Sequence, residues 1–181
     1  MQVHNCYKCT TLSKTRTNIV QGKGPLDAKI MFIGEAPGFN EDKLGEPFIG
    51  KAGAILNNLL SMSNLTRDNV YVTNAVKCRP INLEGGNRRP TDEELETCLP
   101  YLLTEIEEIK PELICTLGAT PLLALEPEGV ISLMHGRLFD RPYGKLIPLY
   151  HPASAIYNRD LYPIQLEDMK FVAESLAKME G

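Results

Sequence analysis

Four of the five cysteines in this chain fall into two groups that are far apart in the sequence. Cys6 and Cys9 form a CxxC motif near the first residue, whereas Cys78 and Cys98 lie in the middle of the chain. A CxxC motif places two thiolates on one tight turn, and two more thiolates complete the ligand set of a zinc ion or an iron–sulfur cluster. Disulfides are the alternative, but a chain of this size can bury a core without crosslinks and shows no secretion signal. The cysteines therefore favour a metal ion or cluster. Cys115 lies in an apolar run and is predicted to be a buried strand residue.

Three other groups of polar residues could contribute to catalysis or to ligand binding. They are a carboxylate-containing loop around residues 34–42, the amide Asn74 and the imidazole of His151. Each has a common structural role when taken alone: a histidine after a strand is usually a hydrogen-bonded structural residue, an asparagine there is usually a cap, and adjacent acids usually form a solvated turn. Their significance depends on whether the fold brings them together.

The elements that must position these residues alternate between strands and helices. Short apolar runs predict strands over residues 29–33, 70–73, 113–117 and 145–150. Apolar spacing predicts helices over residues 52–61, 119–125 and 164–178. Thr91 and Glu94 have the spacing of a capping box, which predicts a further helix that continues to about Lys110 and is ended by Pro111. This alternation predicts an α/β fold of three αβα layers around a central, mostly parallel four-stranded sheet.

In a parallel sheet of this kind, ligands bind beyond the carboxyl ends of the strands. The carboxylate loop follows the first predicted strand, Asn74 follows the second and His151 follows the fourth. We therefore expect these three groups to lie at the same edge of the sheet, and this convergence favours a functional site there.

The composition is that of an ordinary globular protein. The chain has 181 residues, of which 43% are hydrophobic and 23% are charged, and we expect residues 1–181 to form a single domain. No apolar run approaches the roughly 18 residues needed to span a bilayer, so we expect no membrane association. A net charge of −4 argues mildly against a large nonspecific nucleic-acid surface but is compatible with a local basic groove. We expect a cytoplasmic monomer.

Several segments occur together in an order that is more specific than any one of them. They are residues 34–38 (GEAPG) with Glu41 and Asp42, residues 45–53 (GEPFIGKAG), residues 73–80 (TNAVKCRP), Asn87 with Arg88, Cys98, and residues 151–153 (HPA). In this order the chain resembles the family 4 uracil-DNA glycosylases, the iron–sulfur branch of that superfamily. The resemblance covers nearly the whole chain and implies a uracil-DNA glycosylase-like fold.

The resemblance implies an enzyme that flips uracil out of single- or double-stranded DNA and hydrolyses its N-glycosidic bond, leaving an abasic site for base excision repair. Phe48 resembles the aromatic residue that stacks on uracil, and Asn74 the amide that hydrogen-bonds the pyrimidine edge. His151 resembles the histidine placed near uracil O2. The other side of the base would be lined by Gly34, Glu35 and Ala36.

The catalytic carboxylate is less clearly defined by the resemblance. The best-known branch of the superfamily has an aspartate where this chain has Ala36, and alanine cannot perform that role. We therefore expect Glu41 to orient water or to stabilise the cationic sugar, with Asp42 and Glu35 in reserve.

The resemblance also implies a [4Fe-4S] cluster held by Cys6, Cys9, Cys78 and Cys98. The interval between the last two is longer than is usual in the family because of an insert around residues 83–86. We expect the cluster to dock the N-terminal CxxC segment on the Cys78–Cys98 region and not to transfer electrons, because glycosidic hydrolysis requires no redox step.

Residues in the segments that flank the pocket are predicted to contact DNA. The segment after His151 should enter the minor groove, where the family often has Leu-Leu-Arg and this chain has Ala155-Ile156-Tyr157. The predicted DNA contacts are Lys51, Lys77, Arg79, Arg88, Arg137, Tyr157 and Arg159.

Two interpretations without glycosylase activity stay open at this stage. One is a nucleotide-binding protein stabilised by zinc or a cluster, and the other is a DNA-binding scaffold that does not prefer uracil. Both would keep the fold but would release no uracil.

Overall fold

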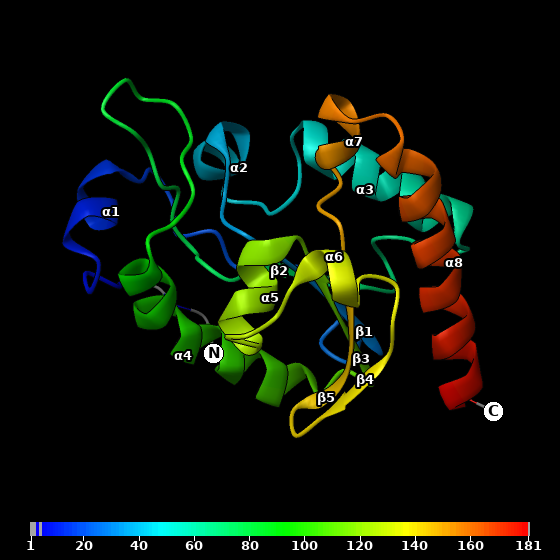
Figure 1. Ribbon diagram of the computed structural model, residues 1–181. Coiled ribbons are helices and arrows are strands. Elements are labelled where there is room, and N and C mark those ends of the chain that lie inside the picture. The colour runs from blue at the N-terminus through cyan, green and yellow to red at the C-terminus, as the bar shows by residue number, and fades with distance from the viewer. Residues whose placement is uncertain (1–2, 4, 181) are drawn as a thin grey trace.

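The computed structural model describes residue 3 and residues 5–180, and a five-stranded sheet forms its centre (Figure 1). The strands follow the order β2-β1-β3-β5-β4 across the sheet. Strands β2, β1, β3 and β5 are mutually parallel, and β4 is antiparallel to β5. The bounds are Ile30–Gly34 for β1, Tyr71–Asn74 for β2, Leu113–Leu117 for β3, Phe139–Arg141 for β4 and Gly144–Leu149 for β5.

The predicted α/β class and mostly parallel sheet are confirmed, but the predicted number of four strands is one too few. The additional strand, β4, has only three residues, none of them fully buried, so it produces no apolar run in the sequence. A two-residue turn joins β4 to β5, because Arg141 pairs with Gly144. Gly144 has a φ of +123°, a conformation that residues with a side chain rarely adopt.

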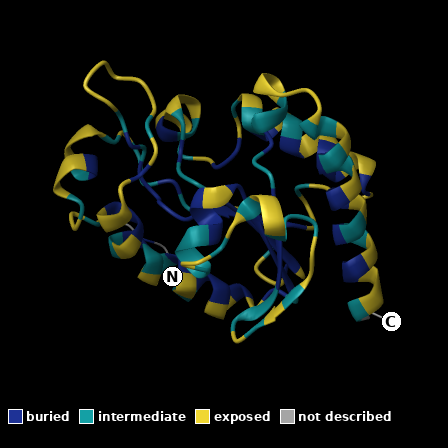
Figure 2. Ribbon diagram, viewed as in Figure 1, coloured by how far each residue is buried: buried dark blue, intermediate teal, exposed yellow. Residues whose placement is uncertain are grey.

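Helices cover both faces of the sheet (Figure 1). Alternate residues of β1 enter different cores: Ile30 and Phe32 belong to one apolar cluster, and Met31 and Ile33 to the other. Helices α3 and α8 pack on the first face, and α4 and α5 on the second, so the inward sides of these helices are buried (Figure 2). The bounds are Thr10–Thr15 for α1, Phe39–Leu44 for α2, Lys51–Met62 for α3, Asp92–Ile109 for α4, Ala119–Leu125 for α5, Ile131–Met134 for α6, Ser154–Tyr157 for α7 and Leu161–Glu180 for α8.

The ends of α4 illustrate how local sequence sets an element. The hydroxyl of Thr91 accepts a hydrogen bond from the Glu94 amide, and the Glu94 carboxylate accepts one from the Thr91 amide, which is the predicted capping box. Lys110 then adopts a left-handed conformation with a φ of +51° directly before Pro111. The shorter helices α1, α2, α6 and α7 have four to six residues and were not predicted, because so few residues cannot display a helical period.

Across the described residues, every helix is too short or too polar to span a lipid bilayer.

Candidate active site

A pocket of about 410 Å³ lies beyond the carboxyl ends of β1, β2 and β5. The structure therefore brings the carboxylate loop, Asn74 and His151 to one place, at the sheet edge where the sequence predicts a site. Its volume suits a small ligand such as a single nucleobase. The lining residues are Glu35, Ala36, Pro37, Gly38, Phe39, Asn40, Glu41, Phe48, Gly50, Lys51, Ala52, Asn74, Pro80, Asn87, Arg88, His151 and Ala153.

Phe48 and Gly34 form one wall of this pocket. A Cβ atom added to Gly34 would collide with the ring of Phe48 and with the side-chain oxygen of Asn74. Only glycine therefore allows the aromatic ring and the amide to approach the end of β1 so closely. The centroids of the Phe48 and His151 rings are 6.3 Å apart with an interplanar angle of 33°, so both rings face the same space.

Asn74 is the last residue of β2 and is only 2% exposed. Its backbone oxygen accepts a hydrogen bond from the Lys77 ammonium group at 2.7 Å, which fixes the main chain. Within the described part of the chain, no group hydrogen-bonds its side-chain amide. A buried amide normally has partners, so both its donor and its acceptor are available to a ligand.

The ring of His151 is held in one tautomer. Its Nδ1 atom accepts a hydrogen bond from the Ala153 amide at 3.2 Å, so in the neutral ring the proton resides on Nε2. Burial lowers the pKa of His151, and the nearby Glu35 carboxylate only partly opposes this effect. The imidazole is therefore neutral near pH 7 and presents an N–H donor.

The loop that carries His151 is anchored to α8. The backbone oxygen of His151 accepts hydrogen bonds from Ser154 Oγ at 2.7 Å and from Gln165 Nε2 at 2.9 Å. Glu35, in the loop after β1, accepts a hydrogen bond from the Thr120 hydroxyl at the start of α5. The loop of His151 is thus fixed by α8, and the Glu35 carboxylate by α5.

Glu41 lies in the first turn of α2 and reaches across to the start of α3. Its Oε1 atom accepts hydrogen bonds from the amides of Gly50 at 2.7 Å and Ile49 at 3.1 Å. The amino terminus of a helix favours such a carboxylate. Oε2 of Glu41 has no hydrogen-bond partner among the described residues and is therefore available to water or substrate.

Asp42 is adjacent in sequence but points in another direction. It is 5% exposed, and its carboxylate accepts hydrogen bonds from the Thr17 amide at 2.9 Å and the Asn18 amide at 3.2 Å. The prediction of Asp42 as a reserve catalytic group is corrected, because its two oxygens anchor the N-terminal segment outside the pocket.

The four predicted metal ligands line one small cavity between the N-terminal segment, the residues after β2 and α4. Three hydrogen-bond donors lie 3.4 Å from sulfur: Arg16 Nη1 to Cys78, the Lys77 amide to Cys98 and the Tyr101 hydroxyl to Cys6. Burial raises the pKa of Cys98 to about 11, so a bound metal would have to displace its proton.

This donor set fits thiolate ligation, because hydrogen bonds to sulfur stabilise cluster-bound thiolates. Among the described residues, no three His, Cys, Asp or Glu side chains form a group that could hold a single metal ion. Cys115 is fully buried in β3 and is not part of the cavity lining, as predicted from its apolar surroundings.

Comparison with known proteins agrees with this geometry. The family model described as the uracil DNA glycosylase superfamily matches residues 21–178. A type-4 uracil-DNA glycosylase of Thermotoga maritima is 44% identical, over 99% of this chain and 93% of that protein. The chain belongs to the type-4 uracil-DNA glycosylase family. A type-4 uracil-DNA glycosylase of Saccharolobus solfataricus is 43% identical, over 97% of this chain and 84% of that protein. One of Archaeoglobus fulgidus is 40% identical, over 99% of this chain and 92% of that protein.

The predicted DNA contacts of this family member divide into three groups. The prediction that Lys77 contacts DNA is corrected, because Lys77 is only 1% exposed. Its ammonium group donates hydrogen bonds to the Glu105 carboxylate at 2.5 Å, to the Thr73 hydroxyl at 2.7 Å and to the backbone oxygen of Asn74, so it cannot reach DNA. The exposed group consists of Lys51, Arg137, Tyr157 and Arg159.

Two predicted DNA contacts have intramolecular partners. Arg88 forms a bidentate pair with Glu94 at 2.7 and 2.8 Å. Arg79 bonds Asn87 Oδ1 at 2.6 Å and the Gly85 oxygen at 3.0 Å, and it lies over the ring of Phe39. Arg79 thus orders the insert, and its DNA contact stays a prediction.

Sequence reasoning missed several residues around the glycosylase pocket. Thr120 and Gly50 act through hydrogen bonds to predicted residues, and Asn40 contributes to the lining. Arg67 was also missed, because it lies in an unremarkable polar turn. Gly50 and Asn40 lie in segments that the sequence singled out, but no pattern marks the roles of these four residues, since the roles depend on contacts between distant elements.

Proposed function

We propose that the protein flips uracil out of DNA and hydrolyses the N-glycosidic bond, leaving an abasic site for base excision repair. The observation that carries this proposal is the buried, unpaired amide of Asn74, which faces a neutral imidazole and an aromatic ring across one base-sized pocket. The names of the type-4 relatives support the same activity.

The pocket can distinguish uracil from cytosine by hydrogen bonding. The Asn74 amide can donate to uracil O4 and accept from N3–H, whereas cytosine presents the opposite pattern at these two positions. Phe48 would stack on the flipped base, with Gly34, Glu35 and Ala36 on its other side. An unmatched polar group in this buried site would cost about 1–3 kcal/mol, which favours uracil.

Cleavage leaves negative charge on uracil and positive charge on the sugar. The Nε2–H group of His151 would donate to uracil O2 as this charge develops. A neutral donor suits this step, because the Ala153 contact fixes the tautomer before the base enters. Glu41 would orient water or stabilise the sugar through Oε2, because Oε1 already accepts two amide hydrogen bonds.

The four cavity cysteines would hold a [4Fe-4S] cluster. The cluster would serve as a structural link between the N-terminal segment and α4, because hydrolysis needs no electron transfer. The ligands would be Cys6, Cys9, Cys78 and Cys98.

DNA would lie across the pocket mouth. Ile156 and Tyr157 are exposed on α7, beside the loop that carries His151, and Tyr157 is 90% exposed. They would enter the minor groove, while Lys51, Arg137 and Arg159 would contact phosphates. The proposed partner is uracil-containing DNA, single- or double-stranded, and the protein would act as a cytoplasmic monomer.

An oligonucleotide with a single uracil tests the proposal. The expected result is strand cleavage at that position after alkali, and no cleavage of a matched strand with cytosine or thymine. A protein that binds DNA without producing alkali-sensitive sites would instead be a cluster- or zinc-stabilised DNA-binding protein. Iron and sulfide analysis of the anaerobically purified protein separates a cluster from zinc.

A further inference from the structure

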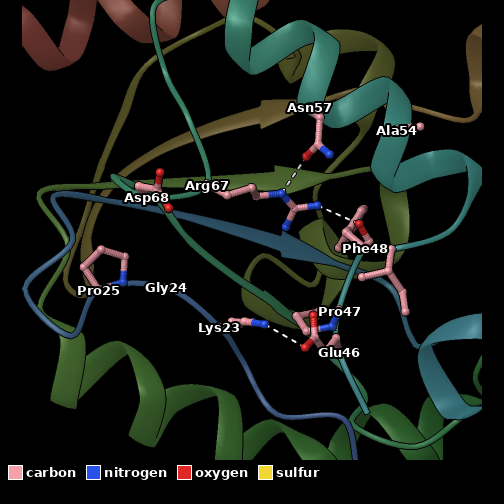
Figure 3. Close-up of a pocket in the computed structure, with 11 residues that line it drawn as sticks. Lys23, Gly24, Pro25, Glu46, Pro47, Phe48, Ala54, Asn57, Arg67 and Asp68 are labelled. Carbon is pink, nitrogen blue, oxygen red and sulfur yellow. Dashed lines mark hydrogen bonds and ion pairs between the residues drawn. The ribbon is translucent and has the colours of Figure 1, made fainter. Parts of the chain in front are cut away.

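A second cavity, of about 640 Å³, lies on the other side of Phe48 (Figure 3). It is open to solvent between the segment of Lys23, the turn around Glu46 and the first half of α3. Arg67, from the turn between α3 and β2, crosses this cavity and points toward Phe48 (Figure 3). Phe48 is therefore the wall that separates this cavity from the candidate uracil pocket.

The Arg67 guanidinium makes two hydrogen bonds in fixed directions. Its Nη2 atom donates to the backbone oxygen of Phe48 at 2.7 Å, and its Nε atom donates to Asn57 Oδ1 at 2.7 Å. Asn57 belongs to α3, so the guanidinium is positioned by a helix and not only by its own flexible stem. Burial lowers the pKa of Arg67, yet the group stays charged at neutral pH because arginine is so strongly basic.

The residue that Arg67 contacts has an unusual backbone. Phe48 has a φ of +54°, a left-handed conformation that is a genuine outlier for a bulky residue. Such a conformation persists only when surrounding contacts enforce it. The Phe48 carbonyl group lies against the backbone of Gly53, where any Cβ atom would collide with it, so glycine at position 53 permits this conformation and other contacts must hold it.

The peptide unit between Phe48 and Ile49 is held at both ends by charged side chains. Its carbonyl oxygen accepts from Arg67, and its N–H donates to Glu41 Oε1 at 3.1 Å. The two charges approach from different cavities, the cation from the second cavity and the carboxylate from the candidate uracil pocket. Rotation of this peptide would move both the stacking ring and the carboxylate.

We infer that Arg67 is a positioning residue for uracil excision, which holds the Phe48–Ile49 peptide in the orientation that presents the Phe48 ring to the base and Glu41 to the sugar. This inference rests on the proposed glycosylase function. Arg67 itself would touch neither the base nor the sugar, because Phe48 lies between Arg67 and the candidate uracil pocket.

Arg67→Ala should lower the single-turnover cleavage rate about ten- to hundredfold, the effect of losing one charged hydrogen bond to a buried group. Binding to uracil-free DNA should stay unchanged. Lys23→Ala is the matched control, because Lys23 is a cation of the same cavity whose ammonium group pairs with Glu46 at 2.8 Å and not with the Phe48 carbonyl oxygen. This control should cleave at the wild-type rate.

Chemical rescue distinguishes positioning from general stabilisation. Because the cavity is open and large, added guanidinium ion should enter Arg67→Ala and restore several-fold of the lost rate, at concentrations far below those that unfold proteins. Sodium chloride at equal ionic strength should not restore the cleavage rate, although it weakens DNA binding. A wild-type rate in Arg67→Ala, or equal effects of the two salts, would overturn the inference.

Two further variants keep the test decisive if Arg67→Ala does not fold. Arg67→Lys keeps the charge but cannot bond Phe48 and Asn57 together with fork geometry, so it should also be slow. Asn57→Ala should show a smaller loss in the same direction. Wild-type rates in both folded variants would refute a positioning role. A wild-type protein that does not cleave uracil-containing DNA would instead refute the proposed function.

Discussion

Lys77 and Glu105 form an ion pair 2.5 Å long in which both side chains are buried. The pair extends to the candidate site, because the same ammonium group donates to Thr73 Oγ1 and to the backbone oxygen of Asn74. The backbone amide of Lys77 also donates a hydrogen bond to Cys98 Sγ at 3.4 Å. A single buried lysine thus links α4, the end of β2 and one of the cavity cysteines.

Removing one partner of this pair should strongly destabilise the fold. Lys77→Met leaves the Glu105 carboxylate buried without its cation, and such losses typically cost about 3–5 kcal/mol. Urea unfolding of Lys77→Met, Glu105→Leu and the double variant measures the effect. The double variant should be more stable than the sum of the two single losses predicts, whereas strict additivity would show that the pair has no coupling.

Asn74→Ala and Asn74→Asp should both reduce uracil cleavage about ten- to hundredfold, because a buried base cannot replace the lost hydrogen bonds with water. Single-turnover rates at saturating enzyme provide the measurement. Asn58→Ala is a matched control, because Asn58 is exposed on α3 and bonds the Tyr162 hydroxyl outside the pocket. If the Asn74 variants cleave as fast as the control, the amide is only a strand cap.

His151→Ala should slow the chemical step about 100- to 1000-fold while leaving binding to uracil-containing DNA largely intact. The reason is that uracil O2 carries substantial negative charge only in the transition state. Rate, DNA affinity and melting temperature should be measured on the same preparation. A parallel fall in all three quantities would indicate that the residue merely supports its loop.

The depressed pKa of His151 also predicts how stability depends on pH. In the unfolded chain this group has a pKa of about 6.5, and in the folded protein its pKa is lower. Between these values the unfolded chain binds more protons, so the stability contributed by His151 is lost as the pH falls below the unfolded value. The free energies of unfolding of the wild type and of His151→Gln, measured by denaturation across this pH interval, should approach each other as the pH falls.

Cys98→Ser should lower iron content and stability more than it alters the rate of the remaining folded enzyme. Cys115→Ser is the control, because Cys115 is also buried but lies in β3, away from the cavity. The control should keep its iron. Equal iron contents in the two variants would remove Cys98 from the ligand set, and zinc without iron would exclude a cluster.

Tyr157→Ala should weaken binding to duplex DNA by about 1 kcal/mol, the lower end of aromatic stacking on a base. Leu26→Ala, another exposed apolar residue, lies before the amino end of β1 and serves as the control. Fluorescence anisotropy with labelled duplex compares them. Equal affinities would place the wedge elsewhere on the segment after His151.

The parts of the fold that depend on local patterns could be predicted from the sequence. Strand β3 was predicted over 113–117 and occurs there, and the capping box at Thr91 sets the start of α4 as expected. The antiparallel strand β4 could not be predicted, because none of its three residues is fully buried and three residues are too few to display a period.

The candidate site shows the same division. Residues at strand ends, such as Asn74 and His151, could be placed because parallel topology brings those ends together. Lys77 could not be distinguished from an exposed DNA-binding lysine, because its partner Glu105 is 28 residues away in the sequence. The same holds for Asp42, whose partners are two backbone amides of the N-terminal segment.

Helix α2 also constrains changes in chain length. Gly38 begins this six-residue helix and Gly45 ends it in a left-handed conformation, with Glu41 and Asp42 facing different parts of the molecule. One inserted residue before Glu41 would rotate both carboxylates by roughly 100° about the helix axis. Glu41 would then lose the α3 amides at the same time as Asp42 loses the N-terminal amides. A substitution at Glu41 or Asp42 therefore removes one of these contacts at a time, whereas a single-codon insertion or deletion would disconnect the pocket and the N-terminal segment together.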